Sequence, residues 1–191
     1  MQAATDAIAR VARRRRISDP DGGLQTTLII AVCPPGAGTA GYAYIGDGMG
    51  VCFAIGEDER PRPFLMPHKA DALQTNLLSA CLGPQVLGAP CSGQFERAEG
   101  EFIVLATDGV ADRVGTEFFG QLLAYIEYCG GDLCAACEAV LKQMADLQDA
   151  AGYICDDNMT LAISGCGVPP GQGKPGGNGR ASSGKPQPAC I

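Results

Sequence analysis

The chain has 191 residues, of which 46% are hydrophobic and 18% are charged, and its formal net charge is −7 at pH 7. This length suits one ordinary domain with an apolar core. The negative charge argues against broad binding to DNA or RNA, which needs a basic surface, and no run of about eighteen apolar residues is present to cross a bilayer. The composition therefore predicts a globular protein that binds neither nucleic acid nor membranes.

The N-terminal stretch predicts a helix that runs from about Thr5 and ends in a basic segment, Arg13 to Arg16. Ile8 and Ala12 are among its apolar positions, and cations at a helix C-terminus are favoured by the helix dipole. The stretch has no apolar segment of the signal-peptide kind, so we expect a cytoplasmic protein. In a reducing compartment, most of the ten cysteines are expected to be buried thiols.

Three apolar runs in the first third of the chain predict consecutive strands. Residues 26–32 are rich in β-branched side chains, and a turn of proline and glycine separates them from the aromatic run 42–45. A tight glycine turn at residues 46–50 then leads into residues 51–55. This pattern predicts two successive hairpins in an antiparallel sheet. Residues 56–95 show no clear hydrophobic periodicity, so neither helices nor strands are assigned there.

The second half of the chain predicts a central strand, two helices and a last strand. Residues 102–106 form an apolar run that is too short for a helix. Residues 118–128 and 133–147 carry apolar side chains every three to four positions, and Asp132 is expected to cap the second helix. The last strand is expected over residues 159–163. Strands, then helices, then a strand predict an α+β fold.

The C-terminal stretch has a different composition. From residue 165 the chain is rich in Gly, Pro, Ser, Lys and Gln and has no acidic residue. Such a segment buries too little apolar surface to offset the entropy of ordering it. We therefore expect a folded domain over residues 1–164 and a disordered tail over residues 165–191.

One group of cysteines has a spacing that suggests another chemistry. Cys129, Cys134 and Cys137, with Cys155 or Cys166 as a fourth ligand, match the spacing of a plant-type iron–sulfur site. Cys134 and Cys137 fall in the early turns of a predicted helix, and Cys137 shares one apolar face with Val140, Leu141 and Met144, which favours core packing. An iron–sulfur or redox protein is thus the lesser alternative.

The single histidine is His68. Any Ser-His-Asp or Cys-His relay would have to use it. The surrounding Pro67-His68-Lys69 lacks the glycine-rich turn that presents a nucleophile. We therefore interpret His68 as a surface residue.

Aspartates stand at three predicted strand edges. Asp47 lies in a Gly-Asp-Gly turn, Asp108 and Asp112 follow the central strand, and Asp157 precedes the last strand. Asp-Gly is a common turn dipeptide, so one such residue alone indicates little. Taken together they predict a shared site. Carboxylate oxygens are the ligands that hard divalent cations prefer, and clustered carboxylates repel one another unless a cation lies between them.

These motifs resemble, in order, those of the PPM family, the metal-dependent protein phosphatases of the type 2C class, particularly its compact bacterial members. The resemblance covers most of residues 26–164. It implies an antiparallel β-sandwich of two sheets flanked by helices on both outer faces. The matching segments are Thr26-Thr27-Leu28, Ile45-Gly46-Asp47-Gly48, Leu105 to Asp112, and Asp157 to Thr160.

The resemblance also implies roles for the aspartates. Asp108 and Asp157 would bind one ion of a Mn²⁺ or Mg²⁺ pair, while Asp47 and Asp112 would join Asp108 around a further ion. The metals would activate a water molecule and orient the phosphate for in-line attack. Three residues are expected to support the ligands without binding metal themselves: Gly109, Asn158 and Asp156.

The activity implied is hydrolysis of phosphoserine or phosphothreonine in a phosphoprotein substrate. Family members carry, ahead of the Thr-Leu strand, an arginine that grips phosphate, an acidic pair, and an Asp-Gly-x-Gly-Gly turn whose aspartate bridges the two metals. None of these is found here, so the chain resembles the C-terminal two thirds of a phosphatase domain and its fold is expected to be incomplete.

The missing N-terminal motifs leave two hypotheses open. The first is an enzyme whose N-terminal half is missing or lies on another chain. The second is a catalytically incomplete, phosphatase-like module that binds a protein partner. In either case an exposed sheet edge would favour self-association.

Overall fold

The computed structural model describes residues 1–18, 24–34, 38–54, 60–68, 78–98, 100–115, 117–146 and 157–165. The predicted tail lies outside these residues except for Gly165, which ends the last strand. The helices are α1 (Gln2–Arg15), α3 (Asp108–Ala111), α4 (Phe118–Tyr128) and α5 (Leu133–Asp146). The strands are β1 (Leu28–Val32), β2 (Thr39–Ile45), β3 (Met49–Phe53), β4 (Arg62–Pro63), β5 (Cys91–Glu96), β6 (Phe102–Ala106) and β7 (Leu161–Gly165).

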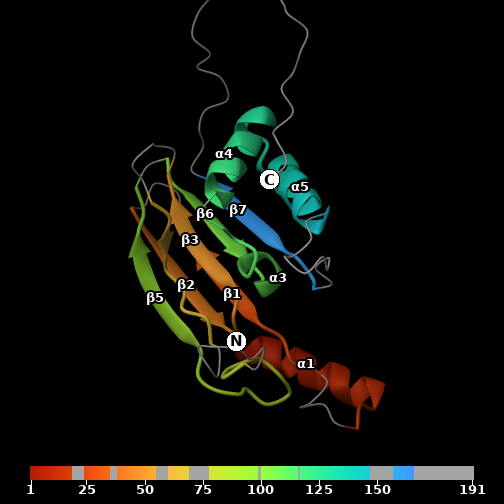
Figure 1. The fold of residues 1–191 in the computed structure, drawn as a ribbon. Coiled ribbons are helices and arrows are strands. Elements are labelled where there is room, and N and C mark those ends of the chain that lie inside the picture. The colour runs from red at the N-terminus through yellow and green to blue at the C-terminus, as the bar shows by residue number, and fades with distance from the viewer. Residues whose placement is uncertain are drawn as a thin grey trace, which may run out of the picture.

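The strands form two antiparallel sheets, one with the order β1-β2-β5 and the other with the order β4-β3-β6-β7. The sheets face each other, and α4 and α5 cover the opposite face of the four-stranded sheet (Figure 1). The prediction of an antiparallel β-sandwich flanked by helices is confirmed. None of the described helices is long and apolar enough to cross a membrane.

Helices on both outer faces were expected, but the described helices cover only one of them. On the outer face of the three-stranded sheet, the side chains of Ile30 and Val32 are 40% and 59% exposed. The helix α1 instead packs near one end of that sheet, where Ile8 contacts a cluster built around the buried Ile45 and Leu82. The described helices thus cover the outer face of the four-stranded sheet and only one end of the three-stranded sheet.

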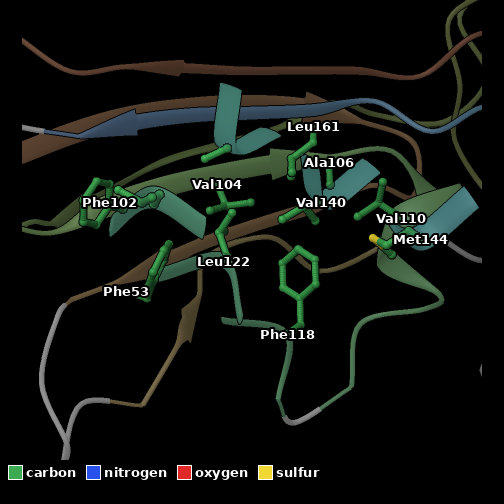
Figure 2. Close-up of a cluster of buried hydrophobic side chains, with 12 residues drawn as sticks. Phe53, Phe102, Val104, Ala106, Val110, Phe118, Leu122, Val140, Met144 and Leu161 are labelled. Atoms are coloured by element: carbon green, nitrogen blue, oxygen red, sulfur yellow. The ribbon is translucent and has the colours of Figure 1, made fainter. Parts of the chain in front are cut away.

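The strand β6 lies at the centre of the core, at the residues that the sequence predicts. Its side chains alternate, as a period of two requires. Phe102, Val104 and Ala106 pack against α4 and α5 (Figure 2). Ile103 and Leu105 face the three-stranded sheet instead. Burial of each large apolar side chain contributes about 1.5–3 kcal/mol, so β6 holds both layers of the fold together.

The helices α4 and α5 form the outer layer of this core. Leu122 of α4 is fully buried, and Val140 and Met144 of α5 pack into the same cluster (Figure 2). Asp132 caps α5, because its Oδ1 accepts hydrogen bonds from the backbone N–H groups of Cys134 (3.0 Å) and Ala135 (3.1 Å). The predicted cap is confirmed.

The second predicted hairpin is wrong. The strand β2 pairs with β1 and β5, whereas β3 pairs with β4 and β6, so the glycine turn carries the chain from one sheet to the other. Gly46 in this turn has φ = 112°, and a Cβ there would lie 2.2 Å from Cγ2 of Thr27. The turn therefore needs glycine at this position. The apolar residues on either side of this turn identify two strands, but they do not show to which sheet each strand belongs.

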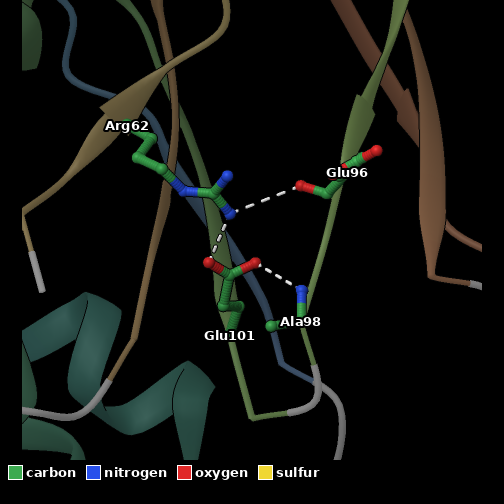
Figure 3. Close-up of polar contacts among 4 residues, drawn as sticks. All are labelled: Arg62, Glu96, Ala98 and Glu101. Atoms are coloured by element: carbon green, nitrogen blue, oxygen red, sulfur yellow. Dashed lines mark hydrogen bonds and ion pairs between the residues drawn. The ribbon is translucent and has the colours of Figure 1, made fainter.

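An ion pair and two hydrogen bonds connect the two sheets at the end where β6 begins. Glu101, only 3% exposed, pairs with Arg62 of β4 and accepts a hydrogen bond from the backbone N–H of Ala98 (2.7 Å). Arg62 also donates to the carbonyl oxygen of Glu96 at the end of β5 (3.3 Å), as Figure 3 shows. β4, and β5 except for its last residue, lie within residues 56–95, where the sequence shows no clear hydrophobic periodicity.

This arrangement makes Arg62 a stability determinant. The substitution Arg62→Met removes this ion pair to the buried Glu101 carboxylate, and because the Arg62 side chain is 55% exposed we expect the free energy of unfolding to fall by about 1–2 kcal/mol. Urea unfolding measures the change.

Arg60→Met is the matched control, because Arg60 is exposed two positions away, and its effect should stay within about 0.5 kcal/mol. Adding Glu101→Gln to Arg62→Met should recover part of the loss, because it removes the unpaired charge. Equal effects of the two arginine substitutions would contradict the assignment.

Candidate functional site

Antiparallel pairing places three chain segments at one edge of the four-stranded sheet. Met49, the first residue of β3, pairs with Ala106, the last residue of β6, and Ala106 pairs with Leu161, the first residue of β7. The residues before β3, after β6 and before β7 therefore meet at the same edge, where α3 begins (Figure 1). This edge is termed the aspartate edge and contains Asp47, Asp108, Asp112 and Asp157.

The hydroxyl of Thr107 joins two of these segments. Its Oγ1 donates to the carbonyl oxygen of Asn158 (3.1 Å) and accepts from the backbone N–H of Thr160 (2.9 Å). The backbone N–H of Thr107 also donates to the carbonyl oxygen of Thr160 (3.1 Å). The ladder between β6 and β7 thus continues past the end of both strands and fixes the segment that carries Asp157. Sequence analysis had assigned no role to Thr107.

The residues after β6 form a single helical turn, α3, with an aspartate at each end. Asp108 begins the turn, and its Oδ1 accepts from the backbone N–H of Gly109 (3.0 Å). Asp112 follows the turn, and its backbone N–H donates to the carbonyl oxygen of Asp108 (2.9 Å). Residues four apart lie on one side of a helix. The two carboxylates therefore belong to the same face of α3.

Gly109 lets the segment before β7 approach α3 closely. A Cβ at Gly109 would lie 2.7 Å from the carbonyl oxygen of Asn158 and 3.4 Å from Cβ of Asp157. A contact below 3.0 Å forces something to move, and here the neighbour is backbone. The absence of a side chain at Gly109 thus brings the chain at Asp157 beside the start of α3.

Asp47 differs from the other three aspartates because it is buried, with 7% exposure. Its neighbour Gly48 is pressed against the end of β6, since a Cβ there would lie 2.4 Å from the carbonyl oxygen of Ala106. Asp108 is half-buried, whereas Asp112 and Asp157 are exposed. The edge thus combines one buried carboxylate with three that solvent reaches.

The donor chemistry of this edge fits a hard divalent cation, because carboxylate oxygens are the ligands that Mg²⁺ and Mn²⁺ prefer. In the part of the chain that the structure describes, no three His, Cys, Asp or Glu side chains lie close enough together to hold a metal ion. Asp156 lies outside the described residues. The metal assignments, and the supporting roles of Gly109 and Asn158, remain predictions.

The interpretation of His68 as a surface residue holds only in part. The side chain is half-buried and stacks on Tyr44 with ring centroids 4.8 Å apart and an interplanar angle of 18°. Its Nδ1 accepts from the backbone N–H of Gly46 (3.1 Å), and its own backbone N–H donates to the carbonyl oxygen of Gly46 (2.9 Å). His68 therefore holds the turn that carries Asp47.

The seven described cysteines are free thiols. Cys52 and Cys81 are buried, and burial raises the pKa of the Cys52 thiol to about 11. Three are half-buried and two are exposed. Of the residues proposed for an iron–sulfur site, Cys129 and Cys137 are half-buried and Cys134 is exposed, whereas both candidates for the fourth ligand lie outside the described residues.

No protein-family model matches the sequence, and no curated protein matches it either. Several solved structures do match the fold. Serine-threonine phosphatase 2C from Toxoplasma gondii has a TM-score of 0.61 at 13% identity, over 85% of this chain and 63% of that one. PppA, described as a key regulatory component of the T6SS in Pseudomonas aeruginosa, has a TM-score of 0.57 at 15% identity, over 83% of this chain and 66% of that one.

A third match is the catalytic domain of the serine/threonine phosphatase PstP, a protein of Mycobacterium tuberculosis, in complex with two manganese ions. Its TM-score is 0.53 at 18% identity, over 83% of this chain and 64% of that one. The chain shares the fold of these three proteins, two of which are serine/threonine phosphatases, and this confirms at the level of the fold the resemblance inferred from the aspartate motifs. It spans less than two thirds of the length of each of the three.

The close approach at Gly109 can be tested by adding one methyl group. We expect Gly109→Ala to lower the free energy of unfolding by about 1–3 kcal/mol, because the new Cβ meets backbone. Thermal or urea unfolding measures the loss.

Gly120→Ala is the matched control, since a Cβ at Gly120 of α4 has no atom within 4 Å. Alanine is the better helix former, so this substitution should leave stability unchanged or raise it by up to about 1 kcal/mol. A Gly109→Ala protein as stable as Gly120→Ala would refute the close approach.

Proposed function

We propose that the aspartate edge binds Mn²⁺ or Mg²⁺ and that the chain hydrolyses phosphoserine or phosphothreonine in a phosphoprotein. The register of β3, β6 and β7 carries this proposal, because it gathers aspartates from three separate segments at one edge. The fold supports it as well, since chains of the same fold include serine/threonine phosphatases, one of them in complex with two manganese ions.

In this proposal Asp108 and Asp157 hold one metal ion, and Asp47 and Asp112 join Asp108 around another. Bound metal supplies an activated water molecule and stabilises charge on the phosphate oxygens. The chain contributes the positions of the ligands. Hydrogen bonds from Thr107 hold the segment of Asp157, and His68 holds the turn before Asp47.

A phosphatase-like binding module is the second candidate. Two observations favour it. Among the described residues, no three His, Cys, Asp or Glu side chains lie close enough together to hold a metal ion. The chain also spans less than two thirds of the length of the three structures it was compared with above. Such a module would bind a protein partner at the same edge without hydrolysis. The proposed cytoplasmic location suits either candidate.

Metal binding and hydrolysis can be measured separately. We expect Mn²⁺ to raise the melting temperature, with about 2.7 kcal/mol of added stability at a free metal concentration one hundred times the Kd. We expect Mn²⁺-dependent hydrolysis of p-nitrophenyl phosphate that falls at least about a hundredfold in Asp108→Asn and in Asp157→Asn. Both substitutions keep the side-chain size and remove the charge.

The control is Asp146→Asn, an exposed aspartate at the end of α5, which should change neither measurement. Stabilisation by Mn²⁺ without hydrolysis would favour the binding module over the enzyme. If Mn²⁺ neither stabilises the protein nor supports hydrolysis, the proposed metal site and the metal-dependent hydrolysis both fail.

A further inference from the structure

An exposed cysteine faces the histidine that holds the Asp47 turn. Cys91 is the first residue of β5, and its Sγ lies 3.3 Å from Nε2 of His68. The two residues are 23 positions apart in the chain. They meet because β5 pairs with β2, where Cys91 is opposite Tyr44, and His68 stacks on the Tyr44 ring.

The hydrogen bonds of His68 determine which of its nitrogens carries the proton. Nδ1 accepts from the backbone N–H of Gly46 (3.1 Å), so Nδ1 has no hydrogen. The neutral ring then carries its hydrogen on Nε2, the atom that faces the sulfur of Cys91. The Tyr44 stack and the backbone bond from His68 to Gly46 keep the ring in this orientation.

The Tyr44 hydroxyl is a second polar group beside the sulfur of Cys91. Its hydroxyl donates to the carbonyl oxygen of Met66 (2.6 Å) and accepts from the Met66 backbone N–H (3.2 Å). Burial raises the pKa of the Tyr44 phenol, and a hydrogen bond with the Cys91 side chain adds to that rise. The Nε2–H of His68 therefore faces the sulfur beside the Tyr44 hydroxyl, and it is the nitrogen donor directed at Cys91.

We propose that Cys91 is an oxidisable thiol that reacts with small hydroperoxides and that His68 activates it. An N–H donor binds a charged thiolate more strongly than a neutral thiol, and the thiolate is the nucleophile. The proposal does not depend on metal binding or phosphatase activity.

The chemical step balances with hydrogen peroxide as the oxidant. The thiolate sulfur of Cys91, whose proton has gone to solvent, attacks one peroxide oxygen. An S–O bond forms and the O–O bond breaks, and the departing hydroxide takes a proton from solvent to become water. The sulfur loses two electrons and becomes a sulfenic acid, while the peroxide is reduced.

Other thiols in the chain provide internal comparisons. Cys134 is also exposed, but it lies in the first turn of α5, where the carboxylate of Asp132 accepts its backbone N–H. Cys52 is 2% exposed, and its raised pKa keeps it a neutral thiol. Reaction at Cys52 would therefore report unfolding rather than native reactivity.

The test treats the full chain with hydrogen peroxide in the presence of dimedone, which traps sulfenic acids, and follows the adduct at each cysteine by peptide mass spectrometry. We expect Cys91 to react about tenfold faster than Cys134, with no adduct at Cys52. Equal rates at Cys91 and Cys134 in the unmodified protein would overturn the proposal.

Two substitutions then test whether the side-chain N–H of His68 activates Cys91. In His68→Asn the amide oxygen can still accept from Gly46, but no N–H reaches the sulfur, so the rate at Cys91 should fall toward that of Cys134, with the Tyr44 hydroxyl still beside the sulfur. In His68→Gln a side-chain N–H can again reach Cys91, and part of the rate should return.

Absence of the Cys52 adduct shows that each variant is folded. An unchanged Cys91 rate in folded His68→Asn would also overturn the proposal, and if that variant unfolds, the comparison in the unmodified protein decides.

Discussion

The pairing of β6 with β3 on one side and β7 on the other is the constraint on which the fold and the candidate site both depend. β6 packs against the helices through one set of side chains and against the second sheet through the other. A slip of one residue would turn each set toward the wrong layer. Because the core fixes this register, it also fixes which residues meet where the strands end.

Elements with a strong local signal were predictable from the sequence. The apolar run of β6 and the helical spacing of α4 give the observed bounds, 102–106 and 118–128. β5 was not predicted because its sequence, Cys-Ser-Gly-Gln-Phe-Glu, is largely polar and most of its residues are exposed. β4 is only two residues long. Neither strand has an apolar pattern of its own, and both are held by pairing to longer neighbours.

The candidate site was predictable in part, for a similar reason. Asp47, Asp108 and Asp157 stand beside strands that are recognisable in the sequence, so their order along the chain indicates a shared edge. The contacts around His68 could not be predicted, because they join residues more than twenty positions apart and depend on β2 pairing with β5. The same long-range pairing explains why the turn at Gly46 was mistaken for a hairpin.

The hydrogen bonds of Thr107 bear on the choice of residue before Asp108. The hydroxyl acts as donor and acceptor at once, to two backbone groups on the same neighbouring segment. Serine can reproduce both bonds, whereas valine, with nearly the shape of threonine, can make neither. A hydroxyl residue followed by Asp-Gly after an apolar strand thus marks a segment whose backbone is held in register with the neighbouring strand.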